Sequence, residues 1–429
     1  MTLPPGWQRC TLDDVKAPVD HAIAGGPFGS DLTAADYTES GVPVIRGGNL
    51  GHGERRFYPD DLVFVADAKA DALRRSLALP GDVLFTQRGT VGQVGLVPAD
   101  LPWPRYLLSQ SQMKLTCDRA RADPEYVYYW CRGPEAQQHM QRSTISAGVP
   151  HTNLAALRRT PIALPPLAEQ RAIAATLSAL DRRLSLCADQ QASLGALVDL
   201  LFRAWFLDHD PVRSKAAGAR HPSVDPEAHA LLPARLVERG GRPVPEGWSL
   251  APLTGLAEFQ NGSSFALADF CAPGDGLPVV KIAELKQGVT RQTRFSRGRD
   301  GARAIARGDL LFSWSGNPDT SIDLFLYGGA PAWLNQHIYK VVPPRPTHGA
   351  WLFGQLRALK PTFVALARAR QTTGLGHVAL KDLRALVVVA PPEPVLAAFD
   401  RTAAPYLERL LACADLSASL ARTRDALLP

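Results

Sequence analysis

The chain has 429 residues, of which 46% are hydrophobic and 21% charged, with 47 basic residues against 41 acidic ones and a formal net charge of +6. This composition is ordinary for a globular protein, and the chain is long enough for more than one domain. The mild excess of basic residues permits a polyanionic partner without requiring one. The sequence has no long apolar run, so we expect no membrane span. Its six cysteines form no C-x-x-C pair, so we expect neither a zinc site nor a disulfide framework. Because the N-terminus shows no signal peptide pattern, we expect a cytoplasmic protein.

The first part of the chain, residues 1–166, is rich in strand patterns. Short β-branched and aromatic runs alternate there with glycine and proline, which predicts strands separated by turns. The clearest candidates are Val42–Ile45, Val83–Thr86 and Pro161–Leu164, and residues 124–140 are predicted to form a helix. The sequence therefore predicts a first α+β domain that ends at Pro165-Pro166.

A long amphipathic helix is predicted next, over residues 167–208. Its apolar residues recur at alternating steps of three and four, which is the heptad pattern of a coiled coil. A helix of about 40 residues would be roughly 60 Å long and could not bury such a stripe alone, so it needs a partner helix. The predicted seam, with Gln191 as its one polar member, consists of Leu177, Leu180, Leu184, Cys187, Gln191, Leu194, Val198, Leu201 and Trp205.

The remaining chain repeats this organisation. Residues 209–240 are predicted as a linker, 241–392 as a second domain, and 393–429 as a second long helix in which Pro405 should cause a kink. Its predicted seam has less strict spacing and comprises Phe399, Ala403, Tyr406, Leu410, Cys413, Leu416, Leu420, Thr423 and Leu427. The simplest way to bury both stripes is to pair the two helices with each other, antiparallel if the domains lie at opposite ends.

The two domains are copies of one module. Gly148, His151 and Leu154 recur as Gly374, His377 and Leu380, each 226 positions later. The repeat is far longer than a solenoid unit of about 20–50 residues, so it indicates a duplicated domain. Further matching pairs are Leu157 and Leu383, Arg158 and Arg384, Pro165-Pro166 and Pro391-Pro392, Lys114 and Lys340, and Gly81-Asp82 and Gly308-Asp309. The predicted fold class is α+β, with two similar domains, two antiparallel coiled-coil helices and a pseudo-two-fold arrangement.

Several motifs in this order resemble the specificity subunit of type I restriction-modification systems. The resemblance covers nearly the whole chain, and the second copy departs from it at Gln260-Asn261-Gly262-Ser263-Ser264 and at its helix start. The motifs are Pro5-Gly6-Trp7, Gly26-Pro27-Phe28-Gly29-Ser30-Asp31-Leu32, Gly41-Val42-Pro43-Val44-Ile45-Arg46, Gly81-Asp82-Val83-Leu84-Phe85 with Arg88-Gly89, and Pro165-Pro166-Leu167-Ala168-Glu169-Gln170-Arg171.

The resemblance implies a DNA-binding subunit without catalysis of its own. Its two target recognition domains would each read one half of a bipartite DNA sequence, and its helices would set the spacing and dock methyltransferase subunits. The implied partners are double-stranded DNA, two methyltransferase (M) subunits and two restriction/translocase (R) subunits. S-adenosylmethionine, ATP and Mg would belong to those partners, with no cofactor on this chain.

The residues themselves agree with a protein that has no catalytic or metal site. We find no phosphate-binding G-x-x-x-x-G-K-[ST], no Asn-Pro-Pro-aromatic motif and no H-E-x-x-H. His151 and His377 are better explained by a structural hydrogen bond. Two alternatives stay open at this point: a stand-alone fused methylating restriction enzyme, and a tandem scaffold that binds protein or carbohydrate.

DNA contacts are expected from basic side chains in loops. Residues 281–307 carry eight Lys or Arg against Glu284 and Asp300, and we interpret the stretch as a basic loop. Acidic residues nearly cancel the charge of the equivalent part of the first copy. The candidate DNA-binding residues are Arg46, Arg55, Arg56, Arg74, Arg75 and Arg88 in the first domain and Lys281, Lys286, Arg291, Arg294, Arg297 and Arg299 in the second.

Overall fold

The computed structural model describes residues 3–51, 55–146, 148–371 and 374–429. The chain forms two compact units, residues 1–188 with 417–429 and residues 189–416. The division falls within the two long helices, because each helix contributes one part to each unit. The units therefore differ from the predicted domains, which end where the helices begin.

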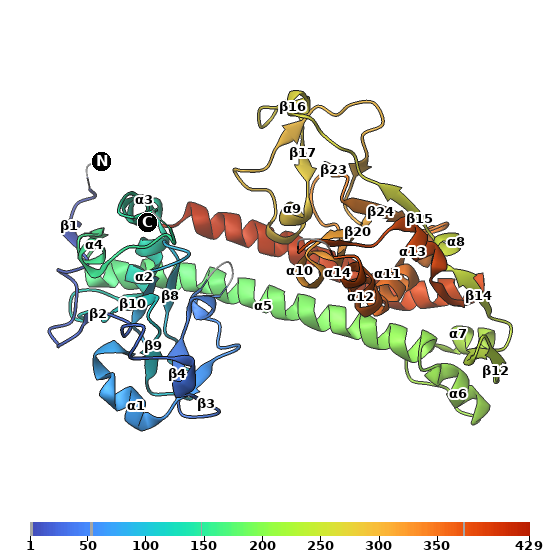
Figure 1. Cartoon of the computed structure of the whole chain (residues 1–429), viewed down its shortest axis with the longest axis horizontal. Helices are drawn as coiled ribbons and strands as arrows, with labels where there is room; N and C mark the ends of the chain where they lie inside the picture. The colour runs from blue at the N-terminus through green and yellow to red at the C-terminus, as the bar shows by residue number, and fades with distance from the viewer. Residues whose placement is uncertain (1–2, 52–54, 147, 372–373) are drawn as a thin grey trace. The chain divides into compact units, whose positions relative to one another are not determined.

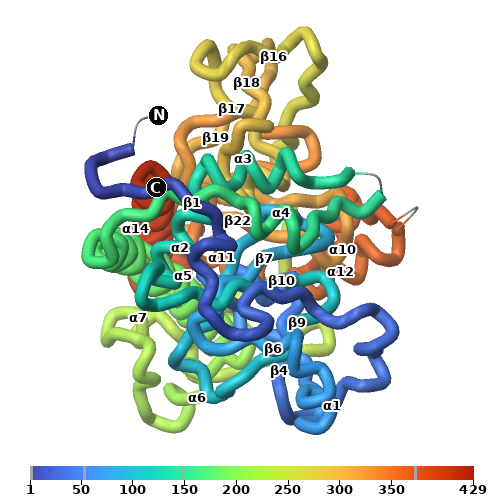
Figure 2. The backbone as a smooth tube through the Cα atoms, turned by 90° about the vertical axis from the view of Figure 1, so that its left-hand side faces the viewer, coloured from blue at the N-terminus to red at the C-terminus, as the bar shows by residue number. Residues whose placement is uncertain are grey.

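The first unit contains two larger sheets (Figures 1 and 2). The four-stranded sheet has the order β2-β10-β7-β8, with β2 at Ile23–Gly25, β7 at Val83–Thr86, β8 at Val94–Leu96 and β10 at Gln112–Leu115. The five-stranded sheet has the order β3-β5-β4-β9-β6, with β3 at Tyr37–Thr38, β4 at Val42–Ile45, β5 at Val63–Val65, β6 at Leu77–Ala78 and β9 at Tyr106–Leu108. A further pair joins β1 (Gln8–Thr11) to β11 (Pro161–Leu164). The three strands predicted from sequence are confirmed.

Short helices cover these sheets. They are α1 (Asp67–Ala72), α2 (Pro124–Arg132), α3 (Pro134–Arg142), α4 (Leu154–Arg158), η1 (Ala34–Asp36), η2 (Gly47–Asn49) and η3 (Arg74–Ser76). The single helix predicted over 124–140 is wrong. Gly133 has extended backbone angles between α2 and α3, because the residue before a proline is driven out of the helical region and Pro134 has no N–H to continue the ladder.

The second unit repeats the strand order of the first. Its four-stranded sheet is β15-β24-β20-β22, with β15 at Glu258–Asn261, β20 at Leu310–Ser313, β22 at Asp323–Leu326 and β24 at Ile338–Val342. Its five-stranded sheet is β16-β18-β17-β23-β19, with β16 at Phe270–Cys271, β17 at Leu277–Val280, β18 at Phe295–Ser296, β19 at Ala304–Ile305 and β23 at Ala332–Leu334. The two-stranded sheets are β14 (Ser249–Pro252) with β26 (Val387–Ala390), β12 (Leu236–Arg239) with β13 (Arg242–Pro245), and β21 (Ser315–Gly316) with β25 (Gly376–His377).

The helices of the second unit are mostly short. They are α6 (Asp210–Ala216), α7 (Pro226–Leu231), α8 (Leu253–Leu256), α9 (Ile282–Gln287), α10 (Pro318–Ser321), α11 (Gly349–Ala358), α12 (Lys360–Ala369), α13 (Leu380–Ala385), η4 (Leu267–Asp269) and η5 (Pro346–His348). Two predictions are corrected here. Residues 209–240 are not a plain linker, since Val212, Val224 and Ala228 are buried in the core of this unit. The stretch 281–307 is not one loop, since it contains α9, β18 and β19.

The duplication is visible in single contacts. In both units the parallel pair of the five-stranded sheet is the same, β4 with β9 and β17 with β23. An ion pair inside each four-stranded sheet also recurs, from Lys114 to Asp82 at 3.0 Å and from Lys340 to Asp309 at 2.7 Å. The repeated Gly-Asp sequence follows from this geometry, because each glycine has a φ of 92°, which a side chain would strain.

Two long helices complete the fold. They are α5 (Leu167–Phe206, 40 residues) and α14 (Glu393–Ala426, 34 residues), the latter continuous through Pro405, where the kink stays a prediction. In the first unit Leu184 and Cys187 pack against Leu420. In the second unit the ring centroids of Phe202 and Phe206 lie 6.3 and 4.8 Å from that of Phe399. Residue numbers rise along α5 as they fall along α14, so the helices are antiparallel within each unit.

The helix seams follow the sequence pattern in α5 and depart from it near the end of α14. In α5, Leu177, Leu184 and Val198 are buried, and Leu180, Gln191, Leu194 and Leu201 are half-buried. In α14, Tyr406 and Leu410 are half-buried and Leu420 is buried, whereas Leu416, Thr423 and Leu427 are exposed. Ser417 and Arg424 are buried instead. Across the described ranges, no helix combines the length and the apolar character that a bilayer-spanning segment needs.

Candidate nucleic-acid interface

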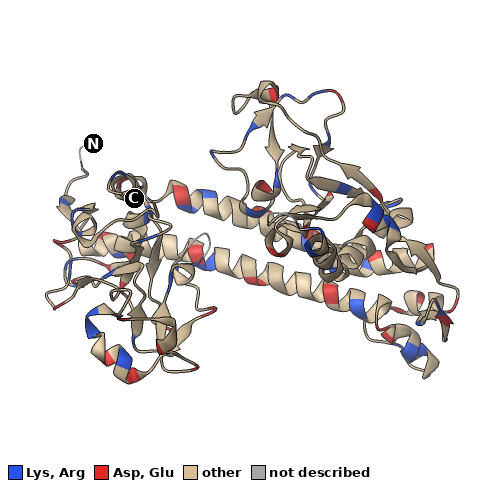
Figure 3. Ribbon diagram, viewed as in Figure 1, with Lys and Arg blue, Asp and Glu red and all other residues tan. Residues whose placement is uncertain are grey.

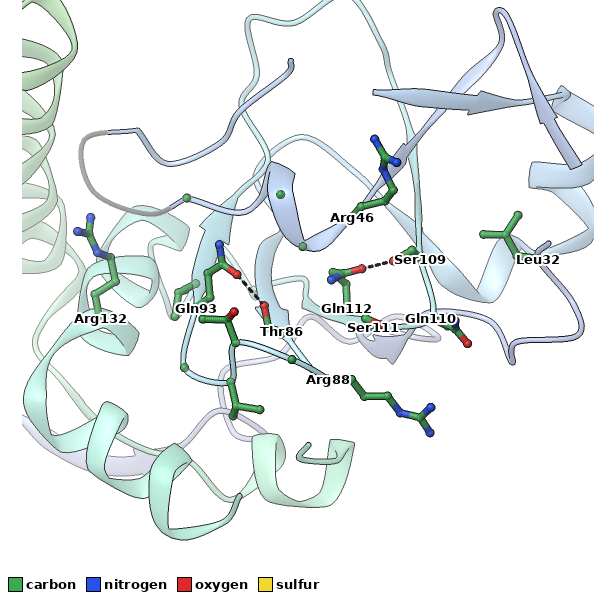
Figure 4. Close-up of a pocket in the computed structure, with 18 of the residues that line it drawn as sticks. Leu32, Arg46, Thr86, Arg88, Gln93, Ser109, Gln110, Ser111, Gln112 and Arg132 are labelled. Carbon is green, nitrogen blue, oxygen red and sulfur yellow. Dashed lines mark hydrogen bonds between the residues drawn. The ribbon is translucent and has the colours of Figure 1, made fainter. Parts of the chain in front are cut away.

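An open polar cleft of about 1040 Å³ lies in the first unit (Figure 4). It forms where three strands end. Arg46 follows β4, the turn 109–111 joins β9 to β10, and the loop 87–93 joins β7 to β8. The two sheets meet here because β9 of the five-stranded sheet leads through this turn into β10 of the four-stranded sheet. β4 and β9 are parallel neighbours, with Ile45 opposite Leu108, so their carboxyl ends reach the same edge.

The cleft is suited to an acceptor-rich, negatively charged ligand. Among the described residues that line it, three are arginines, Arg46, Arg88 and Arg132, and none is acidic. Arg88 is exposed and Arg46 is half-buried, with its guanidinium donating to the Asp61 carbonyl. Guanidinium groups bind phosphate oxygens and can also hydrogen bond bidentately to a guanine edge. The remaining lining residues include Gln93, Gln110, Gln112, Gln137 and several glycines.

Hydrogen bonds hold the walls of the cleft in place. The Gln93 amide donates to the Leu50 carbonyl at 3.0 Å and accepts from the Thr86 hydroxyl at 3.2 Å. The Gln137 amide donates to the Gly92 carbonyl at 2.8 Å. The Ser109 hydroxyl donates to the Gln112 amide oxygen (Figure 4). The loops around Arg88 and Arg46 are thus preorganised, which lowers the ordering cost of binding.

The repeated histidines lie at the base of this loop and of its counterpart. His151 pairs with Arg88 in an isolated β-bridge, and its Nδ1 lies 3.1 Å from the Val149 carbonyl. At the matching place His377 pairs with Ser315 in the β21–β25 ladder. In both copies, therefore, the backbone of the repeated histidine pairs with the loop that follows the strand. At the position of Arg88 the second copy has Ser315.

Other predicted contacts in the first domain lie outside the cleft. Arg55 is half-buried, and Arg74 and Arg75 are exposed on η3; none of the three lines the cleft. They stay predictions that the cleft does not support.

Arg56 is held by the protein itself, and its prediction as a DNA contact disagrees with this geometry. Its guanidinium lies 3.2 Å from Glu125, 3.6 Å from Asp181 and 3.0 Å from the Tyr129 hydroxyl. Burial acts to lower the pKa of Arg56, but Tyr129, Glu125 and Asp181 raise it overall. The cation therefore stays charged and tied to α2 and α5.

The second domain places its basic residues along the five-stranded sheet. Lys281 directly follows β17, as Arg46 follows β4, and Lys286 lies on α9, where it donates to the Thr320 carbonyl. Both are exposed, as are Arg291, Arg294, Arg297 and Arg299. Arg294 lies over the Phe270 ring at 5.8 Å and Arg297 is 3.7 Å from Asp275. Arg294 and Arg297 flank β18, and Figure 3 colours the Lys and Arg residues of this domain blue.

Sequence reasoning missed several polar residues of the cleft, among them Gln110, Gln112 and Arg132. Gln110 could have been found, because Leu108-Ser109-Gln110 is matched by Leu334-Asn335-Gln336. Arg132 comes from the end of α2, and no local pattern marks it. Among the described residues, no group of three or more His, Cys, Asp or Glu is arranged to hold a metal ion.

Comparison with known proteins agrees with this architecture. The family model of the type I restriction modification DNA specificity domain matches residues 33–194. The chain is 21% identical over 439 aligned positions to the type I restriction enzyme MjaIX specificity subunit of Methanocaldococcus jannaschii, covering 100% of this chain and 93% of that protein. It is also 21% identical to the HindI specificity subunit of Haemophilus influenzae, covering 81% and 85%.

A solved structure supports the fold over the full length. A crystal structure of a type I restriction-modification S subunit from M. genitalium aligns with a TM-score of 0.55 at 14% identity, covering 100% of this chain and 97% of that one. Fold and cleft together define a protein with two copies of one recognition module, carried on paired helices. Residues 33–194 thus match the type I restriction modification DNA specificity domain, and the whole chain is similar to type I restriction enzyme specificity subunits.

Proposed function

We propose that the chain is the subunit that recognises the DNA target in a type I restriction-modification complex, with each recognition domain reading one half of a bipartite sequence. The observation that carries the proposal is the cleft in the first domain, with three arginines and no acidic residue among its described lining residues. The exposed cations around β16–β18 support the same role for the second domain. The subunit itself belongs to a non-catalytic family.

The differences between the two copies support two different half-sites. The scaffold contacts recur, as the Lys–Asp ion pair of each four-stranded sheet does. The residues that line the cleft do not, since Arg88 and Gln112 correspond to Ser315 and Ile338. Because base edges are discriminated by the side chains that reach them, the two domains should prefer different sequences.

The helices would set the distance between the half-sites and dock the methyltransferase subunits. At about 1.5 Å per residue, the 40 residues of α5 extend roughly 60 Å. We propose two methyltransferase subunits and two restriction subunits as partners, in the cytoplasm, with S-adenosylmethionine, ATP and Mg bound by those partners.

The helix length gives a direct test of this spacing role. Inserting seven residues after Gln191 lengthens the helix by about 10.5 Å and keeps the heptad phase. The preferred spacer should grow by about three base pairs, at about 3.4 Å each. An insertion of three or four residues serves as control, because it shifts the phase of the seam. An unchanged spacer after the seven-residue insertion contradicts the role of the helices.

The DNA-recognition role is tested by selection from random duplexes. The full chain, alone and with its methyltransferase partners, should select a sequence with two specified parts and a fixed spacer. Affinity should also fall steeply with salt, as phosphate contacts require. Binding that does not depend on sequence, or that prefers a carbohydrate, rejects the proposal.

A further inference from the structure

The two most exposed large hydrophobic side chains of the described residues lie in equivalent connections of the two domains. Phe28 is 83% exposed between β2 and β3, and Leu267 is 84% exposed between β15 and β16, whereas the next, Val149, is 65% exposed. Single exposed apolar side chains are common on protein surfaces. Leu267 opens η4 and so corresponds to Ala34, which opens η1 (Ala34–Asp36), and not to Phe28. What the two domains share is one strongly exposed apolar side chain in the same connection.

Both connections are clamped at their start in the same way. Gly26 donates its N–H to the Gln112 carbonyl and Gly262 donates its N–H to the Ile338 carbonyl, each at 2.9 Å. A Cβ at Gly26 would lie 1.8 Å from the Ser109 carbonyl oxygen, and one at Gly262 would lie 2.1 Å from that of Asn335. Each connection is therefore packed tightly against the turn that precedes β10 or β24.

The exposed side chains themselves are presented by ordered turns. After the buried Pro27, the Asp31 N–H donates to the Phe28 carbonyl at 2.9 Å, and Leu32 is buried again. In the second domain Leu267 opens η4, in which the Ala266 N–H donates to the Asp269 carboxylate at 2.7 Å. The apolar groups are thus held out in solvent by fixed backbone.

Each of the two side chains lies near the groups expected to hold DNA. The clamp of the first connection contacts the wall of the cleft, and Leu32, four residues after Phe28, lines it. In the second domain Phe270, three residues after Leu267, lies under the guanidinium of Arg294 at 5.8 Å.

We propose that Phe28 and Leu267 are apolar wedges, each of which inserts at a base step of the half-site read by its own domain. Phenylalanine and leucine are among the side chains that enter base steps from the minor groove, unstack them partly and bend the duplex. The wedge would position and bend the half-site, while the polar cleft residues read it. The proposal rests on the DNA-recognition function above.

The test uses the full chain with its methyltransferase partners and the duplex that the wild type selects. A fluorescent adenine analogue is placed in one half-site or the other, and its brightening reports unstacking. Phe28→Ala should remove the signal in one half-site and Leu267→Ala in the other, each with about 10-fold weaker binding. Phe28→Leu should retain most of the signal. Val19→Ala and Val387→Ala, at residues 59% and 49% exposed in the two domains, serve as controls and should change neither.

The outcomes separate this inference from the function on which it rests. If the variants keep wild-type affinity and signal while the wild type binds its target specifically, the wedge is wrong and DNA recognition stands. If Phe28→Ala instead releases the methyltransferase subunits and leaves DNA binding unchanged, the side chain faces a protein and the wedge is likewise overturned. If the wild type shows no sequence preference, the proposed function itself fails.

Discussion

A buried ion pair between α5 and α14 gives the sharpest stability prediction. In the first unit Arg424 donates to Asp181 at 3.1 Å, and both side chains are only 5% exposed. The Tyr129 hydroxyl donates to the same carboxylate at 2.7 Å. At the offset of 226 that relates the two copies, Asp181 and Arg424 correspond to Leu407 and Val198, both buried in the second unit. The contact between α5 and α14 is thus ionic at this position in the first unit and apolar at the corresponding position in the second unit.

The size of the effect follows from what each substitution leaves behind. Removing one partner of a buried pair costs about 3–5 kcal/mol, whereas replacing both by apolar residues of fitting shape is often neutral. Arg424→Val leaves Asp181 with Tyr129 and with longer contacts to Arg56 and Arg132 at 3.6 and 3.8 Å. We therefore expect a cost at the lower end, about 3 kcal/mol.

The double variant Asp181→Leu with Arg424→Val installs the residues that the second unit already uses. It should unfold within about 1–2 kcal/mol of the wild type, so the coupling in the double-mutant cycle should be about 4 kcal/mol or more. The assay is urea unfolding of the full chain, followed by circular dichroism and by proteolysis of the end of α14. Additive single effects, or single variants as stable as the wild type, refute the reasoning.

Three further predictions concern the interface and pH. Arg88→Ala should relax the preference at one base pair of one half-site, by about 1–3 kcal/mol if the contact is bidentate, as measured by selection from random duplexes; an unchanged motif counts against the cleft. Arg294→Ala with Arg297→Ala should weaken binding to all sequences alike and reduce the salt slope by about 2, whereas a change restricted to one base would contradict a phosphate role. Burial raises the pKa of Asp400, which accepts the Ala350 N–H at 3.1 Å. A raised carboxylate pKa makes the folded state less stable as the pH rises through that pKa. Asp400→Asn should therefore increase the free energy of unfolding at neutral pH and lose this gain near pH 4. A difference in unfolding free energy that does not change with pH contradicts this.

Much of the fold follows from short-range patterns. Val42–Ile45 and Val83–Thr86 are buried β-branched runs bounded by glycine, and the heptads of α5 fix both its length and its buried face. The pattern fails where local sequence conflicts with it. Gly133 interrupts a stretch that is otherwise helical, and the tertiary pairing with Asp181 draws Arg424 into the seam of α14 in place of the predicted Thr423.

The site was only partly predictable, for a geometric reason. Arg46 and Arg88 each follow a strand that the sequence shows clearly, so their place at the sheet edge could be expected. Arg132 and Arg56 could not be separated from sequence, because both approach Asp181, at 3.8 and 3.6 Å, and only Arg132 also lines the cleft. Which of the two arginines faces the cleft depends on the packing between α2, α5 and a loop, and no local sequence pattern encodes that packing.

The most direct test is to determine the sequences bound by the full chain with its methyltransferase partners, for the wild type and for Arg88→Ala. We predict a bipartite motif with a constant spacer, in which Arg88→Ala degrades one half and leaves the other half and the spacer intact. A single uninterrupted motif, or loss of preference in both halves together, would contradict two domains that read DNA independently.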